Sequence, residues 1–152
     1  MKREQTNEAR RKFLRKTAAC TGAGLLASAL PTQAYAYVGG AGEISVALVG
    51  CGGRGTGAAA QAIQADPAVR LVAMADVFED QLQNSFKGLS IKYADSGQIK
   101  VSPETMFVGF DAYKKAIDMA DVVILTTPPG FRPVHFEYAV NQDKHVFMEK
   151  PL

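Results

Sequence analysis

Short apolar runs alternate with helix-like stretches from Glu43 onward, and their order predicts a sheet of about five strands. Residues 44–49 (Ile-Ser-Val-Ala-Leu-Val) are apolar at almost every position, which is typical of a central parallel strand covered on both faces. Further apolar runs predict strands at residues 69–75, 106–110, 122–126 and 145–148.

The stretches between these strands have the features of helices. Helices are predicted at residues 55–65, from the second strand through about 93, at 111–119 with Asp111 as N-cap, and at 133–141 with Pro133 near the first turn. Residues 94–102 are polar and predict a loop. The alternation favours the α/β class: a Rossmann-like, doubly wound parallel sheet whose right-handed crossovers place helices on both faces.

Charge is distributed unevenly along the chain. Its 152 residues carry 17 Lys and Arg against 15 Asp and Glu, a net charge of +2. Residues 1–36 hold seven of the basic and two of the acidic groups, which leaves ten basic against 13 acidic groups for the remainder. The part expected to fold is therefore acidic, and composition gives no support for a nucleic-acid partner.

Residues 1–36 have the three-part order of a secretory signal. A basic start precedes an uncharged apolar run over residues 17–30, and the small-residue site Ala34-Tyr35-Ala36 follows. Cleavage is predicted after Ala36, with residues 37–42 as a flexible lead. The apolar run is shorter than the roughly 20 residues that a membrane span needs, so no stable membrane span is expected.

The basic start also indicates the export route. It resembles the twin-arginine (Tat) signal, whose arginine pair, phenylalanine and leucine correspond to Arg10, Arg11, Phe13 and Leu14. The alternative is a basic amphipathic helix at an ordinary N-terminus, which the cleavage site disfavours. We expect the Tat machinery as a partner and a periplasmic or otherwise exported location.

A glycine-rich loop follows the first predicted strand. Residues 50–55 (Gly-Cys-Gly-Gly-Arg-Gly) fit the pattern G-x-G-x-x-G. In this pattern Gly50 permits a tight turn, Gly52 lets backbone N–H groups approach a pyrophosphate, and Gly55 lets the helix pack close to the strand. The pattern alone is a weak signal, but a strand before it and a helix after it predict a dinucleotide site.

An acidic residue at the end of the second predicted strand strengthens this interpretation. Asp76 lies 21 residues after Gly55, where an acid can bind the adenosine ribose hydroxyls. The same acid repels a 2′-phosphate, so NAD is favoured over NADP. NADP stays open because the guanidinium of Arg54 can pair with a phosphate. The alternative is a glycine-rich turn with Asp76 as a helix N-cap.

Two further segments give the chain a family resemblance. Thr126-Thr127-Pro128-Pro129 closes the fourth predicted strand, His135 follows in the next helix, and Glu149-Lys150-Pro151 closes the fifth strand. Together with the glycine loop and Asp76, the region from Ile44 to Leu152 resembles the N-terminal domain of the Gfo/Idh/MocA family, which includes glucose-fructose oxidoreductase and inositol dehydrogenase.

The resemblance implies roles for individual residues. In that family the loop like Thr126–Pro129 lies along the cofactor, and the lysine of the Glu-Lys-Pro motif reaches the nicotinamide ribose and the substrate. It therefore implies that Lys150 is the catalytic residue that orients and polarises the substrate; without the resemblance Lys150 would be a surface lysine that ends a strand. The predicted cofactor-binding residues are Gly50, Gly52, Gly53, Arg54, Gly55, Asp76, Thr126, Pro128, His135, Glu149 and Lys150.

The two histidines and the one cysteine downstream of the signal do not predict a metal site. His135 is as compatible with packing or hydrogen bonding as with a cofactor contact, and His145 is interpreted as structural. Together with Cys51 they show no recognisable ligand spacing, so no metal is expected.

In the family that the chain resembles, a dinucleotide domain is followed by a larger α+β domain that carries the substrate pocket. We therefore expect residues 43–152 to be a Rossmann domain that is incomplete at its C-terminus, in a chain that is a fragment; a natural truncation is the alternative. The parent protein is expected to oxidise sugar or polyol CH–OH groups by hydride transfer to NAD, and a homo-oligomer is open for the full-length form.

Export by a Tat route also fits a cofactor that is held tightly, because Tat carries folded proteins. A cofactor that is never exchanged must return to its starting redox state in each turnover. This requirement indicates coupled oxidation and reduction of sugars, or a redox-neutral reaction such as that of the NAD-dependent glycosidases of the same family. The competing class is a stand-alone, non-catalytic nucleotide-binding module.

Overall fold

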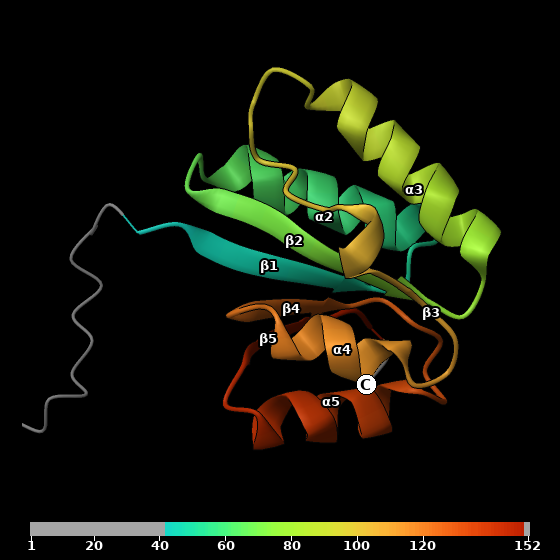
Figure 1. The fold of residues 1–152 in the computed structure, drawn as a ribbon. Coiled ribbons are helices and arrows are strands. Elements are labelled where there is room, and N and C mark those ends of the chain that lie inside the picture. Colours follow the sequence, from blue (N-terminus) through green and yellow to red (C-terminus); the bar gives the residue numbers. More distant parts are fainter. Residues whose placement is uncertain (1–41, 151–152) are drawn as a thin grey trace, which may run out of the picture. The chain divides into compact units, whose positions relative to one another are not determined.

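The computed structural model describes residues 42–150, in which five parallel strands form one sheet (Figure 1). The strand order is β3-β2-β1-β4-β5. The predicted signal at residues 1–36, its cleavage site, most of the predicted lead and Pro151 lie outside the described residues. The strands are β1 (Ile44–Val49), β2 (Val69–Asp76), β3 (Met106–Val108), β4 (Val122–Leu125) and β5 (His145–Met148).

Helices cover both faces of the sheet, which confirms the predicted doubly wound α/β class. Figure 1 shows α2 and α3 on one face and α4 and α5 on the other. A short 3₁₀ helix, η2, precedes β3. Their bounds are α2 (Gly53–Ala65), α3 (Glu79–Lys92), η2 (Pro103–Thr105), α4 (Ala112–Asp118) and α5 (Arg132–Asn141).

Strand β1 supplies side chains to two separate apolar cores, because successive residues of a strand point to opposite faces. Val46 and Leu48 pack with residues of α2 and α3, whereas Ala47 and Val49 pack with residues of α4 and α5. All four are buried. The almost unbroken apolar run of β1 is therefore the consequence of burial on both faces, as predicted.

The element boundaries differ from the prediction in a few places. Helix α2 begins two residues earlier than predicted, at Gly53. Strand β3 stops at Val108 instead of residue 110, where Gly109 turns the chain with a φ of +117°. Asp111 occupies the predicted N-cap position of α4 but its side chain caps no backbone group; it pairs with Lys114 at 2.8 Å.

The order of the strands determines where a ligand can bind. The chain adds β2 and β3 on one side of β1 and then returns to add β4 and β5 on the other side. In open parallel sheets the carboxyl ends of the strands at such a reversal point border a crevice. The glycine loop after β1, Asp76, the loop after β4 and Glu149 all lie at this edge.

Within residues 42–150, no helix combines the length and the hydropathy that crossing a membrane requires.

Candidate functional site

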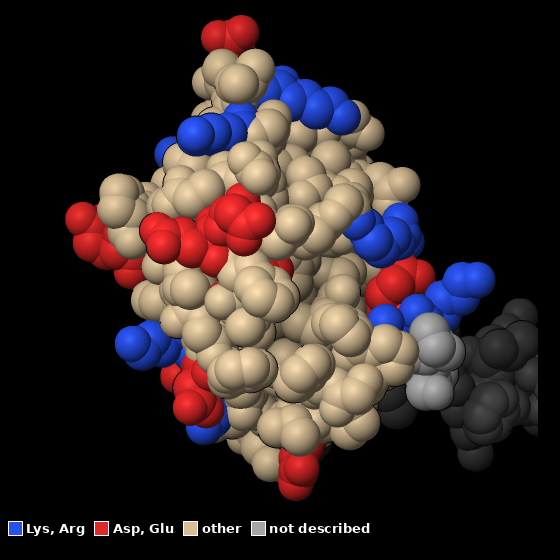
Figure 2. Space-filling model, turned by 90° about the vertical axis from the view of Figure 1, so that its right-hand side faces the viewer, with Lys and Arg blue, Asp and Glu red and all other residues tan. Residues whose placement is uncertain are grey.

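A cleft of about 710 Å³ lies at the carboxyl ends of the strands. The surface around it is mainly uncharged, with acidic and basic side chains at its margins (Figure 2). The lining residues come from the carboxyl ends of the strands, from the connections that follow them and from the first turns of α2, α3 and α5. The predicted site residues in the lining are Gly50, Gly52, Arg54, Asp76, Thr126, Pro128, His135, Glu149 and Lys150.

Two of the motif glycines are required by close backbone packing. Gly50 has a φ of +96°, and a Cβ there would lie 2.7 Å from the backbone nitrogen of Thr127. A Cβ at Gly55 would lie 1.9 Å from the carbonyl oxygen of Gly50. Gly55 therefore has the predicted role of bringing α2 close to β1, and it does not line the cleft.

The middle of the loop is open by comparison. A Cβ at Gly52 or Gly53 would meet nothing within 4 Å. The first backbone N–H groups of a helix have no intrahelical partner, and no described side chain caps those of α2. Open backbone N–H groups at a helix N-terminus form a site that suits a phosphate. Gly53 belongs to this turn, although it is not part of the cleft lining.

Asp76 is held by backbone donors from both sides. Its Oδ2 accepts a hydrogen bond from the N–H of Cys51 at 2.6 Å, and its Oδ1 accepts one from the N–H of Phe78 at 2.9 Å. The carboxylate thus connects the glycine loop to the turn before α3. The alternative of an N-cap is wrong in detail, because Phe78 is the N-cap residue of α3.

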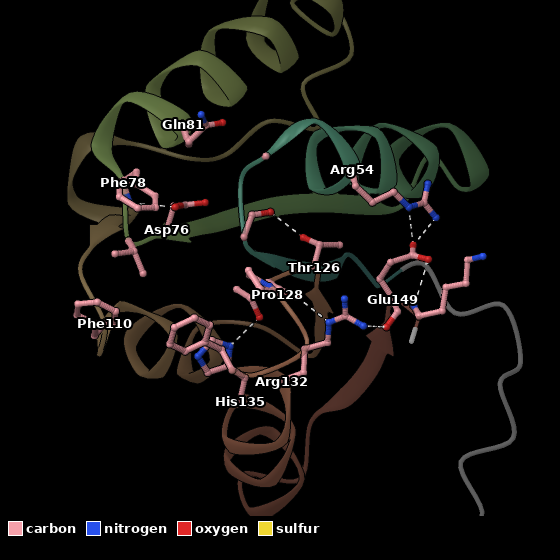
Figure 3. Close-up of a pocket in the computed structure, with 16 residues that line it drawn as sticks. Arg54, Asp76, Phe78, Gln81, Phe110, Thr126, Pro128, Arg132, His135 and Glu149 are labelled. Carbon is pink, nitrogen blue, oxygen red and sulfur yellow. Dashed lines mark hydrogen bonds and ion pairs between the residues drawn. The ribbon is translucent and has the colours of Figure 1, made fainter. Parts of the chain in front are cut away.

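Arg54 and Glu149 form an ion pair at the other end of the cleft from Asp76 (Figure 3). The Nε of Arg54 donates to Oε2 of Glu149 at 2.5 Å. The hydrogen bond from Arg54 lowers the pKa of Glu149 below its ordinary value of 4.5. Because Arg54 is directed toward Glu149, its position does not favour contact with a 2′-phosphate beside Asp76.

The loop after β4 is fixed to the glycine loop. Oγ1 of Thr126 donates to the carbonyl oxygen of Gly50 at 2.7 Å, and the N–H of Thr126 donates to the carbonyl oxygen of Val49 at 2.9 Å. The N–H of Phe131 donates to the carbonyl oxygen of Pro128 at 3.0 Å and closes a turn. Thr126 therefore positions the loop, and both Thr126 and Pro128 border the cleft.

His135 is buried beneath this loop. Its Nδ1 is hydrogen-bonded to Oγ1 of Thr127 at 3.1 Å, and its ring centroid lies 4.2 Å from that of Tyr113. The prediction left packing and cofactor contact open for His135. The structure gives it packing and hydrogen-bonding partners at the base of the cleft.

Burial lowers the pKa of His135 below its ordinary value of 6.5, so the unfolded chain binds the proton more readily than the folded protein. We expect the contribution of this pKa difference to the free energy of unfolding to be complete above pH 6.5 and to be lost as pH falls through the folded-state pKa of His135. Urea denaturation between about pH 7 and about pH 5 measures this loss. His135→Gln should show a smaller decrease than wild type; equal decreases would contradict the assignment.

Several residues of the cleft were not predicted from the sequence. Arg132 is 7% exposed and donates hydrogen bonds to backbone carbonyl groups at the ends of two different segments, Thr127 and Glu149. Exposed aromatic side chains also border the cleft on the side of Asp76. These are Phe78 and Phe110, together with Phe131, whose ring centroid lies 6.2 Å from that of Phe110.

Cys51 is buried next to Asp76. Burial raises the pKa of the Cys51 thiol well above its ordinary value, and the charge of Asp76 raises it further. A thiol that stays protonated is a poor nucleophile. In the described range 42–150, no group of three or more His, Cys, Asp and Glu side chains is arranged to hold a metal ion.

The parallel strand order, the open N-terminus of α2 and the acid at the end of β2 define a dinucleotide-binding α/β domain. A family model for the oxidoreductase family with an NAD-binding Rossmann fold matches residues 44–152. The chain therefore belongs to the Gfo/Idh/MocA family, as its motifs predicted, and its fold is the NAD-binding fold of that family. No curated protein matched the chain.

Solved structures with similar folds include two inositol dehydrogenases. Apo scyllo-inositol dehydrogenase from Lactobacillus casei is 26% identical with a TM-score of 0.55, covering 72% of this chain and 29% of that chain. Its structure with bound NAD(H) and scyllo-inositol is 28% identical with a TM-score of 0.52, covering 72% and 28%. Myo-inositol 2-dehydrogenase from Lactobacillus plantarum, at 24% identity and a TM-score of 0.52 over 72% and 28%, supports the fold alone.

The chain spans less than a third of the length of these inositol dehydrogenase structures.

Proposed function

We propose that the chain is the NAD-binding part of an oxidoreductase that acts on the CH–OH groups of a sugar or polyol. The observation that carries the proposal is a single cleft with Asp76 at one end and the Glu149–Lys150 turn at the other, with the open turn of α2 between them. Family membership and the inositol dehydrogenases with similar folds support this class of reaction.

The residues present fit a dinucleotide. The backbone at Gly52 and Gly53 is open, which leaves room for a pyrophosphate at the N-terminus of α2. Asp76, already held in place by two backbone N–H groups, can accept hydrogen bonds from the adenosine ribose. The apolar side chains Phe78 and Phe110 border this end of the cleft and can flank the adenine.

The other end of the cleft would face the reacting groups. NAD supplies the hydride acceptor for oxidation of the hydroxyl-bearing carbon. Thr126 and Pro128 would border the nicotinamide side. Lys150 would donate a hydrogen bond to the substrate oxygen and stabilise its developing charge, while a base of the further domain would take the hydroxyl proton. The substrate itself is proposed to lie between this surface and a further domain of the parent protein, since relatives with this fold are much longer.

We also propose that the protein is exported by the Tat route with its NAD already bound. The arginine pair Arg10-Arg11, the uncharged run that follows it and the small-residue site at Ala36 support this proposal. Folding around NAD in the cytoplasm would provide the cofactor outside, where no free pool replaces it.

The expected result is that protein purified from the periplasmic fraction carries NAD. Extraction with acid or alcohol followed by mass spectrometry measures NAD per chain, and replacing both Arg10 and Arg11 with Lys should leave the protein in the cytoplasm. Protein that arrives without NAD and binds it only at millimolar concentrations would contradict the tightly held cofactor. Recovery of the Arg10→Lys/Arg11→Lys variant in the periplasm would contradict the Tat route.

A further inference from the structure

The guanidinium of Arg132 connects the loop after β4 to the end of β5. Its Nε donates to the carbonyl oxygen of Thr127 at 2.7 Å, and its Nη1 donates to the carbonyl oxygen of Glu149. Figure 3 shows the side chain between these two segments, and only 7% of its surface is exposed. A single buried side chain therefore holds together the two segments that border the proposed nicotinamide end.

Helix stability does not explain a cation at this position. Arg132 is the first residue of α5, where the positive end of the helix dipole disfavours a positive charge. Burial of the guanidinium adds a desolvation cost, which hydrogen bonds must offset. A side chain kept at such a cost in the wall of a binding cleft indicates a role in the site.

The end of β5 needs a support of this kind. Among the described residues β5 pairs with β4 alone. The N–H of Glu149, directly after β5, donates to the carbonyl oxygen of Leu125 at the end of β4 at 3.1 Å. Arg132 binds the carbonyl of the same residue, and Arg54 binds its carboxylate from α2. Lys150, which follows directly, is thus placed by contacts to Glu149 from two helices.

We propose that Arg132 is a positioning residue that holds the Glu149–Lys150 turn against the loop after β4, so that Lys150 is placed to meet NAD. This inference rests on the proposed function. It assigns to Arg132 an effect that acts through Lys150 and is distinct from any contact of its own with the cofactor.

A double-mutant cycle on NADH affinity tests the proposal. Binding is measured on the full chain, after any NAD that it carries has been removed, by NADH fluorescence, which the absence of tryptophan simplifies. Lys150→Met is expected to weaken binding about tenfold in the wild-type background, the size of one charge-assisted hydrogen bond. In the Arg132→Met background the same change should weaken binding by less than about threefold, because the lysine is no longer held in place.

Two further variants separate positioning from general stability. Arg132→Lys keeps the positive charge and can still donate to the carbonyl oxygen of Thr127 or Glu149, so it should restore part of the effect of Lys150→Met on NADH affinity. Arg70→Met serves as the matched control, since Arg70 pairs with Glu43 at 2.8 Å outside the cleft, and it should leave the effect of Lys150→Met unchanged. If Arg132→Met does not fold, the same cycle with Arg132→Lys must give an intermediate coupling.

The outcomes distinguish this inference from the proposed function. Wild-type protein that binds no NADH would overturn the proposed function. Wild-type protein that binds NADH, with Lys150→Met equally harmful in both backgrounds, would overturn the positioning role of Arg132 alone.

Discussion

Gly55→Ala is expected to disrupt folding of the domain more than any other single methyl group added to the glycine loop. The new Cβ would lie 1.9 Å from the carbonyl oxygen of Gly50 and 2.5 Å from Oγ1 of Thr126. This clash can be relieved only if α2 moves away from β1, because the nearest atom belongs to the buried backbone of Gly50. We expect a loss of about 3 kcal/mol or more, at the upper end for overpacking, as a lower midpoint in urea denaturation.

The same helix provides the matched control. Gly57 lies two residues further along α2, and a Cβ there would meet nothing within 4 Å. Gly57→Ala should therefore stabilise the protein by about 0.5–1 kcal/mol, because alanine loses less backbone entropy than glycine in a helix. Similar midpoints for the two alanine variants would show that the close approach of α2 to β1 is wrong.

The parts of the site that were predicted correctly depend on local backbone geometry. The spacing of Gly50, Gly52 and Gly55 specifies a turn, an open loop and a close helix approach, and all three are set within six residues of chain. The buried run of β1 likewise specifies its central place in the sheet. Features that local sequence determines can be predicted without knowing which segments become neighbours.

Arg132 could not be predicted, because its role depends on contacts between segments. It donates to the carbonyl groups of Thr127, five residues earlier, and of Glu149, 17 residues later, and the pairing of β4 with β5 brings these two residues together. The sequence does contain one signal: a basic residue directly before Pro133, where the first turn of a helix favours acidic residues. The ion pair between Arg54 and Glu149 is another contact between distant segments. Because the sequence does not reveal this pair, Arg54 remained a candidate partner for the 2′-phosphate of NADP.

Asp76→Asn is expected to change both the affinity for NAD and the choice between NAD and NADP. The amide retains one acceptor oxygen, so one of the two backbone N–H groups that Asp76 now binds would face an NH₂ group. NAD affinity should fall about tenfold or more, since hydrogen bonds to a charged group contribute about 1.5–3 kcal/mol. Loss of the negative charge should also remove its repulsion of a 2′-phosphate.

The ratio of the NADH affinity to the NADPH affinity separates the effect of the lost charge from the effect of a loosened glycine loop. A loosened glycine loop weakens NADH and NADPH alike, whereas loss of the charge should lower the preference for NADH by roughly tenfold to a hundredfold. Asp111→Asn is the control: this exposed carboxylate pairs with Lys114 outside the cleft, so both affinities should stay unchanged. If Asp76→Asn lowers the affinities for NADH and NADPH equally, Asp76 stabilises the glycine loop without selecting the cofactor.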